Sequence, residues 1–362
     1  MDISLLEAGK AVILGVVEGV TEFLPISSTG HLIVAGDILH FTGEKAKVFE
    51  VFIQLGAILS VVWLYRKKIF DFSQGDASLA AGWMTFWTKV FVSFLPAAVI
   101  GLLFHSYIKE HLFTVETVAL ALIGGGIVIL GVEAYVKEKA KGGSLHQIHH
   151  MQAFWIGMAQ VLALVPGVSR SGATIMGGLL QKLDRKTATE YSFFLAIPTM
   201  LAATLFDLVK SRGAISGGGD VIIFGIGFVF AFLSGMVAIK TFMRFISTHS
   251  FKGFAWYRII FGTLLLCAAS AQILGAIFSE FCDLASWLQP VPKISSSDSY
   301  EPCARVRVRR RSREFLAARG GGASGDGWIC GASTSPSECE RLRASRFYKG
   351  DHVTVQNNSA SL

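Results

Sequence analysis

The sequence predicts an all-α polytopic membrane protein, built from six transmembrane helices and two re-entrant helix hairpins in an inverted-topology repeat. Three observations support this fold class. Hydrophobic residues make up 52% of the 362 residues and charged residues only 16%, against roughly 25% charged in soluble domains. Six apolar runs are about long enough to cross a bilayer as helices of about 20 residues. Two further apolar stretches are each interrupted by proline, glycine and serine.

The apolar runs define the elements in chain order. The six expected spans are residues 47–65, 84–105, 114–136, 188–209, 220–243 and 254–278. The interrupted stretches, 11–40 and 151–182, contain PISSTG and PGVSRSG. Proline and glycine end helices, and the halves left on either side are too short to span. Because broken backbone at membrane depth needs surrounding protein or a wet cavity, we expect two hairpins that enter the membrane and return.

The two interrupted stretches resemble each other. A shift of 142 residues places Gly15 on Gly157, Glu18 on Gln160, Ser27 on Ser169, Thr29 on Ser171, Gly30 on Gly172, Ile33 on Ile175 and Gly36 on Gly178. Each half then has one hairpin followed by three spans, so the hairpins enter from opposite faces. We therefore expect repeat 1 at about 1–140 and repeat 2 at about 150–280, with a site near the midplane where the halves meet.

Lysine and arginine are distributed unevenly between the two sides of the expected spans. One side has Arg66, Lys67, Lys68, Lys137, Lys139, Lys141, Lys182, Arg185, Lys186, Arg244 and Lys252; the other has Lys10, Lys45, Lys47, Lys109, Lys210 and Arg212. By the positive-inside rule the first side is cytoplasmic. Both termini and the mouth of the first hairpin then face outward.

The composition changes after about residue 280. Residues 281–362 are rich in serine, glycine and arginine without a sustained period, which predicts a disordered basic tail after a membrane domain at 1–280. A non-native origin, such as a misread frame, is a second explanation for a segment that does not continue the membrane pattern. A basic arm for anionic lipid or nucleic acid is the functional alternative. We expect no nucleic-acid partner.

Two carboxylates lie in the first interrupted stretch. Glu18 and Glu22 are four residues apart and so share one face of an apolar helix. An ionisable side chain at membrane depth is costly and indicates function by default. Two adjacent carboxylates repel each other, so they need a cation, a shared proton or water. We therefore expect Glu18 and Glu22 to be catalytic and to be candidate ligands of a metal ion; a solvated helix face is the alternative.

The turn after Pro25 supplies hydroxyls and an imidazole. Ser27, Ser28 and Thr29 are followed by Gly30 and His31. Turn amides and the start of the next helix favour a phosphate there, which makes Thr29 and Gly30 candidate phosphate-binding residues. His31 can transfer a proton near neutral pH, although a packed or capping histidine is the alternative. Ser27, Ser28, His31 or a water molecule could be the nucleophile.

The second interrupted stretch supplies the positive charge. Arg170 lies between Ser169 and Ser171, and a planar guanidinium flanked by hydroxyls suits a phosphate. An arginine that anchors the helix at the membrane surface is the alternative. Acids, hydroxyls, an imidazole and an anion-binding turn together favour phosphoryl transfer or hydrolysis, in which positioning and charge neutralisation do most of the catalysis.

These motifs are similar to those of a known family. EGVTEFLPISSTGH at 18–31 and PGVSRSGAT at 166–174 resemble the signature motifs of the bacterial undecaprenyl-diphosphate phosphatases, the bacitracin-resistance family. FEVFIQLGAI at 49–58 and EYSFFLAIPTM at 190–200 also look like that family's segments. The resemblance covers residues 1 to about 278, and the tail departs from it.

The resemblance implies a multi-pass enzyme of the bacterial inner (plasma) membrane that hydrolyses undecaprenyl diphosphate to undecaprenyl phosphate and phosphate. This reaction recycles the lipid carrier for peptidoglycan synthesis and confers bacitracin resistance. The resemblance implies Glu18 and Glu22 as the acidic pair, Ser27, Ser28, Thr29 and His31 as the hydroxyl–histidine group, and Ser169, Arg170 and Ser171 as the phosphate-binding turn. It also implies a divalent cation, Mg or Ca. Membrane lipid is an expected partner, and a homodimer is one possible assembly.

A transporter or lipid-carrier flippase is the competing function, since inverted repeats with broken helices are also transporter architecture. Glu18 and Glu22 would then couple ions, and Arg170 would bind an anionic substrate without chemistry. The cluster of serine, threonine and histidine favours the phosphatase, because ion coupling does not need it.

Overall fold

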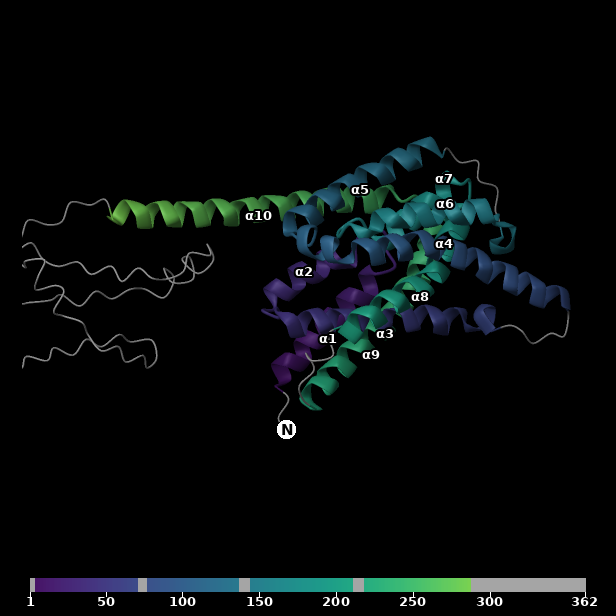
Figure 1. Ribbon diagram of the computed structural model, residues 1–362, viewed down its shortest axis with the longest axis horizontal. Coiled ribbons are helices and arrows are strands. Elements are labelled where there is room, and N and C mark those ends of the chain that lie inside the picture. The colour runs from purple at the N-terminus through teal and green to yellow at the C-terminus, as the bar shows by residue number, and fades with distance from the viewer. Residues whose placement is uncertain (1–3, 71–76, 137–143, 211–217, 288–362) are drawn as a thin grey trace, which may run out of the picture. The chain divides into compact units, whose positions relative to one another are not determined.

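The computed structural model describes residues 4–70, 77–136, 144–210 and 218–287, and these ranges contain helices and no strands. In chain order they are α1 (Leu5–Thr21), α2 (Ser28–Ile38), α3 (Glu44–Phe70), α4 (Ala77–His111), α5 (Val115–Tyr135), α6 (His150–Val161), α7 (Arg170–Leu180), α8 (Arg185–Lys210), α9 (Gly218–Ile246) and α10 (Lys252–Trp287), with 3₁₀ turns η1 (Leu145–Gln147) and η2 (Leu162–Leu164) (Figure 1). The all-α prediction is confirmed. The tail from residue 288 onward lies outside the described residues, and the predicted domain boundaries stay a prediction.

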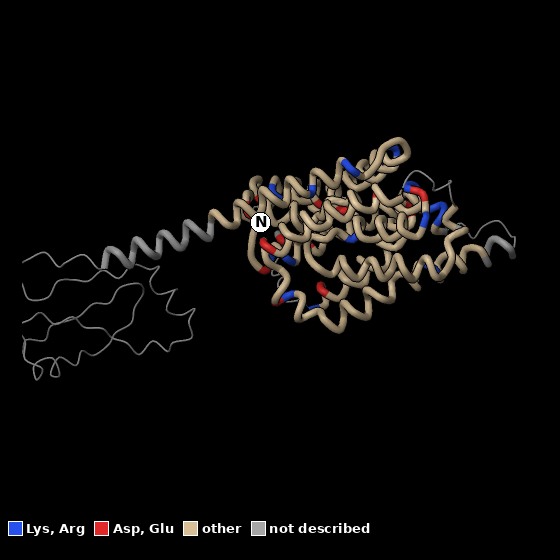
Figure 2. The backbone as a smooth tube through the Cα atoms, turned by 90° about the horizontal axis from the view of Figure 1, so that it is seen from above, with Lys and Arg blue, Asp and Glu red and all other residues tan. Residues whose placement is uncertain are grey.

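Six of the described helices are long and apolar enough to cross a membrane. They contain Glu44–Ile69, Gly82–His111, Val115–Tyr135, Arg185–Lys210, Asp220–Ile246 and Lys252–Ala271, one for each predicted span. Most of each helical tube carries neither acidic nor basic residues (Figure 2). The protein is therefore a multi-pass membrane protein.

Four shorter helices form the two interrupted stretches. Helix α1 packs against α2, and α6 packs against α7, so each interrupted stretch does fold back on itself. None of the four is among the described helices that could span a membrane. Their entry into the membrane from opposite faces stays a prediction.

Matched glycines allow the first helix of each hairpin to pack closely against a spanning helix of the other half. A methyl group on Gly15 of α1 would overlap the carbonyl oxygen of Gly227 on α9. A methyl group on Gly157 of α6 would overlap the carbonyl oxygen of Ser93 on α4 in the same way. Small residues at such crossings let helix backbones approach in membranes. In the repeat, α1 corresponds to α6 and α9 corresponds to α4. The contact between α1 and α9 is therefore the counterpart of the contact between α6 and α4, as a repeat with two equivalent halves requires.

Helix α8 packs between other spans and against α7 of the second interrupted stretch. Residues 187–196 are all buried, and α8 contacts α3, α4 and α7. Phe193 packs edge-on against Phe23, which lies directly after Glu22, with ring centroids 5.6 Å apart. Edge-to-face pairs of this kind add about 0.5–1.5 kcal/mol beyond area burial. The aromatic core therefore supports the segment that contains the candidate site.

Candidate active site

The two helix breaks have the same local geometry. Helix α1 ends at Thr21 and α2 begins at Ser28, whereas η2 ends at Leu164 and α7 begins at Arg170. The residue before each new helix is a serine with positive φ, 70° at Ser27 and 73° at Ser169. A left-handed backbone conformation with positive φ costs a residue other than glycine about 1–2 kcal/mol. Each break therefore holds a strained serine at the start of a short helix.

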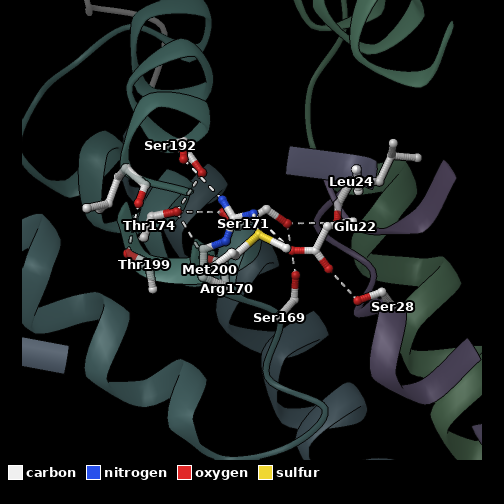
Figure 3. Close-up of polar contacts among 12 residues, drawn as sticks. Glu22, Leu24, Ser28, Ser169, Arg170, Ser171, Thr174, Ser192, Thr199 and Met200 are labelled. Carbon is white, nitrogen blue, oxygen red and sulfur yellow. Dashed lines mark hydrogen bonds and ion pairs between the residues drawn. The ribbon is translucent and has the colours of Figure 1, made fainter. Parts of the chain in front are cut away.

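An ion pair joins the two breaks. Arg170 Nη2 donates to Glu22 Oε1 at 2.9 Å, and Ser28 Oγ donates to the other carboxylate oxygen, Oε2, at 2.5 Å (Figure 3). The side chains of Arg170 and Glu22 are only 11% and 9% exposed. The structure thus brings together one acid, one hydroxyl and one guanidinium that the sequence analysis assigned to the site.

Arg170 points into the protein. Its Nη1 donates to the Ser192 carbonyl at 3.1 Å, and its Nη2 also lies 3.1 Å from the sulfur of Met200 (Figure 3). Its Nε is buried and makes no hydrogen bond to any described residue. An arginine that anchors a helix at the membrane surface would extend its guanidinium outward. The buried ion pair favours a role in the site instead.

The two serines beside Arg170 support the second turn. Ser169 Oγ accepts from the Gly172 amide at 3.2 Å and lies 3.0 Å from Ser171 Oγ. Ser171 Oγ donates to the Leu24 carbonyl in the first break at 2.8 Å (Figure 3). The two hydroxyls thus hold the backbone of both breaks, and the phosphate-binding role expected for Ser169, Arg170 and Ser171 stays a prediction.

The carboxylate of Glu18 is buried inside the protein. The residue is 0% exposed, and neither carboxylate oxygen makes a hydrogen bond to any described residue. Its charge interacts with those of Glu22, Glu50 and Arg170. A buried charge of this kind is costly unless a proton, a cation or hydrogen-bond donors compensate it.

The site also fits the divalent cation that the sequence analysis expects. Among the described residues, no group of three His, Cys, Asp or Glu side chains could hold a metal. Mg²⁺, however, is usually bound by one or two carboxylates together with water and substrate phosphates. The carboxylate of Glu18, which forms no hydrogen bond within the described part of the chain, suits such a site, with Glu22 one helical turn away.

His31 faces helix α10 and makes no hydrogen bond with the Glu22–Arg170 pair within the described structure. Its Nδ1 lies 2.7 Å from the Ser27 carbonyl, and its Nε2 lies 2.6 Å from the hydroxyl of Tyr257. The ring also stacks on Phe261, with centroids 4.6 Å apart and an angle of 16° between the planes. His31 therefore sits beside the site, bound at both nitrogens.

The two remaining expected residues lie at the start of α2. Thr29 is half-buried. Gly30 is buried, and a Cβ there would come within 3.2 Å of Leu122 and 3.4 Å of Val118 on α5. The absence of a side chain at Gly30 thus allows α2 to pack against α5. The phosphate-binding role assigned to Thr29 and Gly30 stays a prediction.

The sequence analysis did not identify Arg258, which the structure places between the two breaks. Arg258 is 0% exposed. Its guanidinium donates to the carbonyls of Pro25 at 3.2 Å and Gly167 at 3.1 Å, one in each break, and to those of Leu122 and Ala121 on α5. The sequence did contain a signal for this residue, because Arg258 is a lone arginine inside an apolar span. An ionisable side chain at membrane depth is costly and indicates function, for Arg258 as for Glu18.

Comparison with known proteins finds similarity over most of the membrane region. The family described as "Bacitracin resistance protein BacA" matches residues 11–264. The chain is 54% identical over 270 residues to the undecaprenyl-diphosphatase of Methylobacillus flagellatus, covering 74% of this chain and 98% of that protein. It is 49% identical over 288 residues to that of Cupriavidus metallidurans (74% and 97%) and 47% identical over 264 residues to that of Thermoanaerobacter sp. (73% and 97%).

Proposed function

The chain belongs to the family of the bacitracin resistance protein BacA, and we infer from this membership that it hydrolyses undecaprenyl diphosphate to undecaprenyl phosphate and inorganic phosphate. It is therefore a hydrolase of a lipid phosphoric anhydride. Its similar relatives are named for this reaction, so a transporter or flippase is not favoured. The cell-wall role expected from the sequence follows from the same reaction.

We place the reaction at the cluster of Glu22, Ser28 and Arg170. The observation that supports this placement is the contact between an arginine of one half and an acid–hydroxyl pair of the other. A diphosphate bound there would meet a cation and a hydroxyl in a site largely closed to solvent. Charge stabilisation is most effective in such surroundings.

Ser28 is the nucleophile that the geometry supports best. Nucleophile and base must lie within about 2.6–3.2 Å of each other, and Ser28 Oγ already donates to Glu22 at 2.5 Å. Attack by Ser28 Oγ on the terminal phosphorus forms an O–P bond, breaks the bridging P–O bond and releases undecaprenyl phosphate. The serine proton passes to Glu22, and water then cleaves the phosphoserine to release phosphate.

Arg170 would stabilise the charge that develops during this transfer. Its Nη2 reaches Glu22 while its Nε makes no hydrogen bond among the described residues, so the guanidinium retains a donor for a phosphate oxygen. Bidentate binding of a phosphate by arginine adds geometric specificity to the charge. The serines on either side keep the turn in place.

A divalent cation, Mg or Ca, would be held by Glu18 and Glu22. When bound, it would supply neutralisation of the diphosphate charge. Glu18 contributes a carboxylate that makes no hydrogen bond within the described structure. Removal of divalent ions by a chelator should therefore reduce turnover, and Mg²⁺ or Ca²⁺ should restore it.

The cellular setting is also a proposal. The excess of lysine and arginine on one side of the spans supports an inner-membrane orientation in which the first hairpin opens to the periplasm. The polyprenyl chain of the substrate and the surrounding membrane lipid would contact the apolar faces of the spans. A homodimer stays a prediction, which cross-linking in intact membranes can test.

Phosphate release from undecaprenyl diphosphate by the purified full-length chain tests the function directly. Rapid acid quenching with substrate labelled in the terminal phosphate tests the nucleophile, because the label should be found on Ser28 and disappear in Ser28→Ala. Ser27→Ala should retain the labelled intermediate. Turnover without any labelled protein at the earliest times would favour direct attack by water.

A further inference from the structure

Three residues, Ser27, Tyr257 and Phe261, hold the imidazole of His31 in place. The Ser27 carbonyl lies 2.7 Å from Nδ1, and the Tyr257 hydroxyl lies 2.6 Å from Nε2. The rings of Tyr257 and His31 are within 5° of parallel with centroids 5.7 Å apart, and Phe261 stacks at 4.6 Å. Tyr257 and Phe261 both come from α10, whereas Ser27 belongs to the first break. One catalytic candidate is thus held between two elements far apart in the sequence.

These contacts determine the tautomer. A carbonyl oxygen can only accept, so the proton of neutral His31 must be on Nδ1. The lone pair of Nε2 then faces α10 and accepts the hydroxyl proton of Tyr257. Among the described residues, the charged group that acts on His31 is Arg258, the neighbour of Tyr257 on α10. Nε2 is consequently the only nitrogen of His31 that can exchange a proton with a substrate or water.

The second half has no equivalent of this arrangement. The shift of 142 residues that relates the two stretches places His31 on Ala173. The Ala173 amide donates to the Ser169 carbonyl at 3.0 Å as part of an ordinary helical turn. In the first break the imidazole of His31 reaches the equivalent carbonyl of Ser27. The histidine is therefore specific to the half that also supplies Glu22 and Ser28, and its tyrosine partner on α10 comes from the other half.

We propose that Tyr257 is a positioning residue for the phosphatase reaction, which orients His31 and keeps its Nε2 as the proton-accepting nitrogen. This inference rests on the proposed function and adds a residue to it. The serine proton goes to Glu22, so the proton left for His31 is that of the water which cleaves the phosphoserine. In the resting enzyme the Tyr257 hydroxyl lies 2.6 Å from Nε2, in the position that this water must take to pass its proton to His31. The Tyr257 hydroxyl orients the imidazole before the substrate binds. It then moves away from Nε2 when proton transfer begins.

The test is a double-mutant cycle with undecaprenyl diphosphate as substrate. General acid–base groups accelerate reactions by about 10²–10⁴-fold. Because Tyr257 only positions such a group, we expect Tyr257→Phe to lower kcat by about 10–100-fold with little change in KM. In the His31→Gln background the same substitution should change kcat less than about twofold, because residues that act as a unit are not additive. The pH profile of Tyr257→Phe should lose or displace the limb that His31→Gln removes. Trp256→Phe, at a neighbouring residue that is 57% exposed, is the control.

A second measurement does not depend on activity. The imidazole ¹⁵N signals of His31, assigned by their loss in His31→Gln, should report a proton on Nδ1 in the wild type and a changed tautomer balance in Tyr257→Phe. If the wild type is active, either of two results would overturn the proposal. One is that the effects of Tyr257→Phe and His31→Gln on kcat are additive; the other is that Tyr257→Phe leaves both the pH profile and the ¹⁵N signals unchanged. A wild type that releases no phosphate would instead overturn the function on which the proposal rests.

Discussion

Ser27 and Ser169, one in each half of the chain, adopt the same strained backbone conformation, with φ of 70° and 73° and ψ of 100° and 115°. Each is the last residue before a short helix. Only Ser169 uses its side chain to cap that helix; at Ser27 no such bond is made. The shared conformation is thus a property of the break and does not depend on the cap.

We expect glycine to be better tolerated than alanine at Ser27. Both substitutions remove the hydroxyl, but only glycine removes the backbone strain, so the free energy of unfolding of Ser27→Gly should exceed that of Ser27→Ala by about 1–2 kcal/mol. Thermal unfolding of the purified variants in detergent measures the difference. Ser4 precedes α1 with an ordinary φ of −62°, so glycine should have a smaller advantage over alanine there, limited to the usual preference of helix N-caps. Equal stability of the two Ser27 variants would contradict the strain.

Arg170→Lys should lower kcat by at least about 100-fold, the scale found when one transition-state donor is removed. Lysine retains the charge but loses the planar, two-point geometry of the guanidinium. Lipid binding should change less, because the polyprenyl chain contributes apolar contacts of its own. Turnover and lipid binding are measured separately on the same sample, with Arg66→Lys at the exposed end of α3 as the control. Weakened binding with a near-native kcat would make Arg170 a simple binding group.

Glu18→Gln should abolish turnover without loss of stability. The substitution keeps the shape of the side chain but removes a buried carboxylate that makes no hydrogen bond in the described structure, so folding loses no ion pair or hydrogen bond. The dependence on divalent cation should disappear together with the activity. Glu7→Gln, at a solvent-accessible position of the same helix, should behave as the wild type. Near-native phosphate release by Glu18→Gln would show that this acid is structural.

Gly15→Ala and Gly157→Ala should each destabilise the protein by about 1–3 kcal/mol, the usual cost of overpacking. In both variants the new methyl group overlaps backbone of the facing helix, which cannot move as a side chain can. Gly9 lies on the same helix as Gly15, and a Cβ at Gly9 would have no atom within 4 Å, so Gly9→Ala is the matched control. Similar unfolding temperatures for Gly15→Ala and Gly9→Ala would contradict the close packing of α1 and α9.

Single cysteines at Lys67 and Lys109 should react with membrane-impermeant reagents from opposite faces. These residues lie in the last turns of the consecutive spans α3 and α4, so an antiparallel pair must expose them on different sides. In the proposed orientation Lys109 is accessible from the periplasm. The experiment needs a background without the five native cysteines. Labelling of both positions from one side would break the six-span topology.

The spans and the breaks could be predicted because each has a local cause. A long apolar run has to cross the bilayer, and Pro25 or Pro166 followed by glycine or serine cannot continue a helix. The meeting of Glu22 with Arg170 was also accessible, since the repeat places the two turns opposite each other. Those predictions needed only composition, spacing and symmetry.

The partners of His31 and Arg258 could not be predicted in the same way. Tyr257 is 226 residues from His31, and nothing in the surrounding apolar run distinguishes it from an interfacial tyrosine. The carbonyls bound by Arg258 belong to the backbone, which has no sequence signal of its own. Both contacts also break the symmetry of the repeat, so the second half offered no template for them.

Arg258 has a consequence for biogenesis. The carbonyls of Pro25 and Gly167 are released from helical hydrogen bonding by the two breaks, and their donor belongs to the last of the six spans in chain order. During insertion the two carbonyls therefore lack this donor until α10 is in place. Until then, water or other donors must form hydrogen bonds with them. The proposed active site can be completed only after α10 is inserted, so a ribosome-bound chain that ends before α10 should be integrated in the membrane and yet inactive.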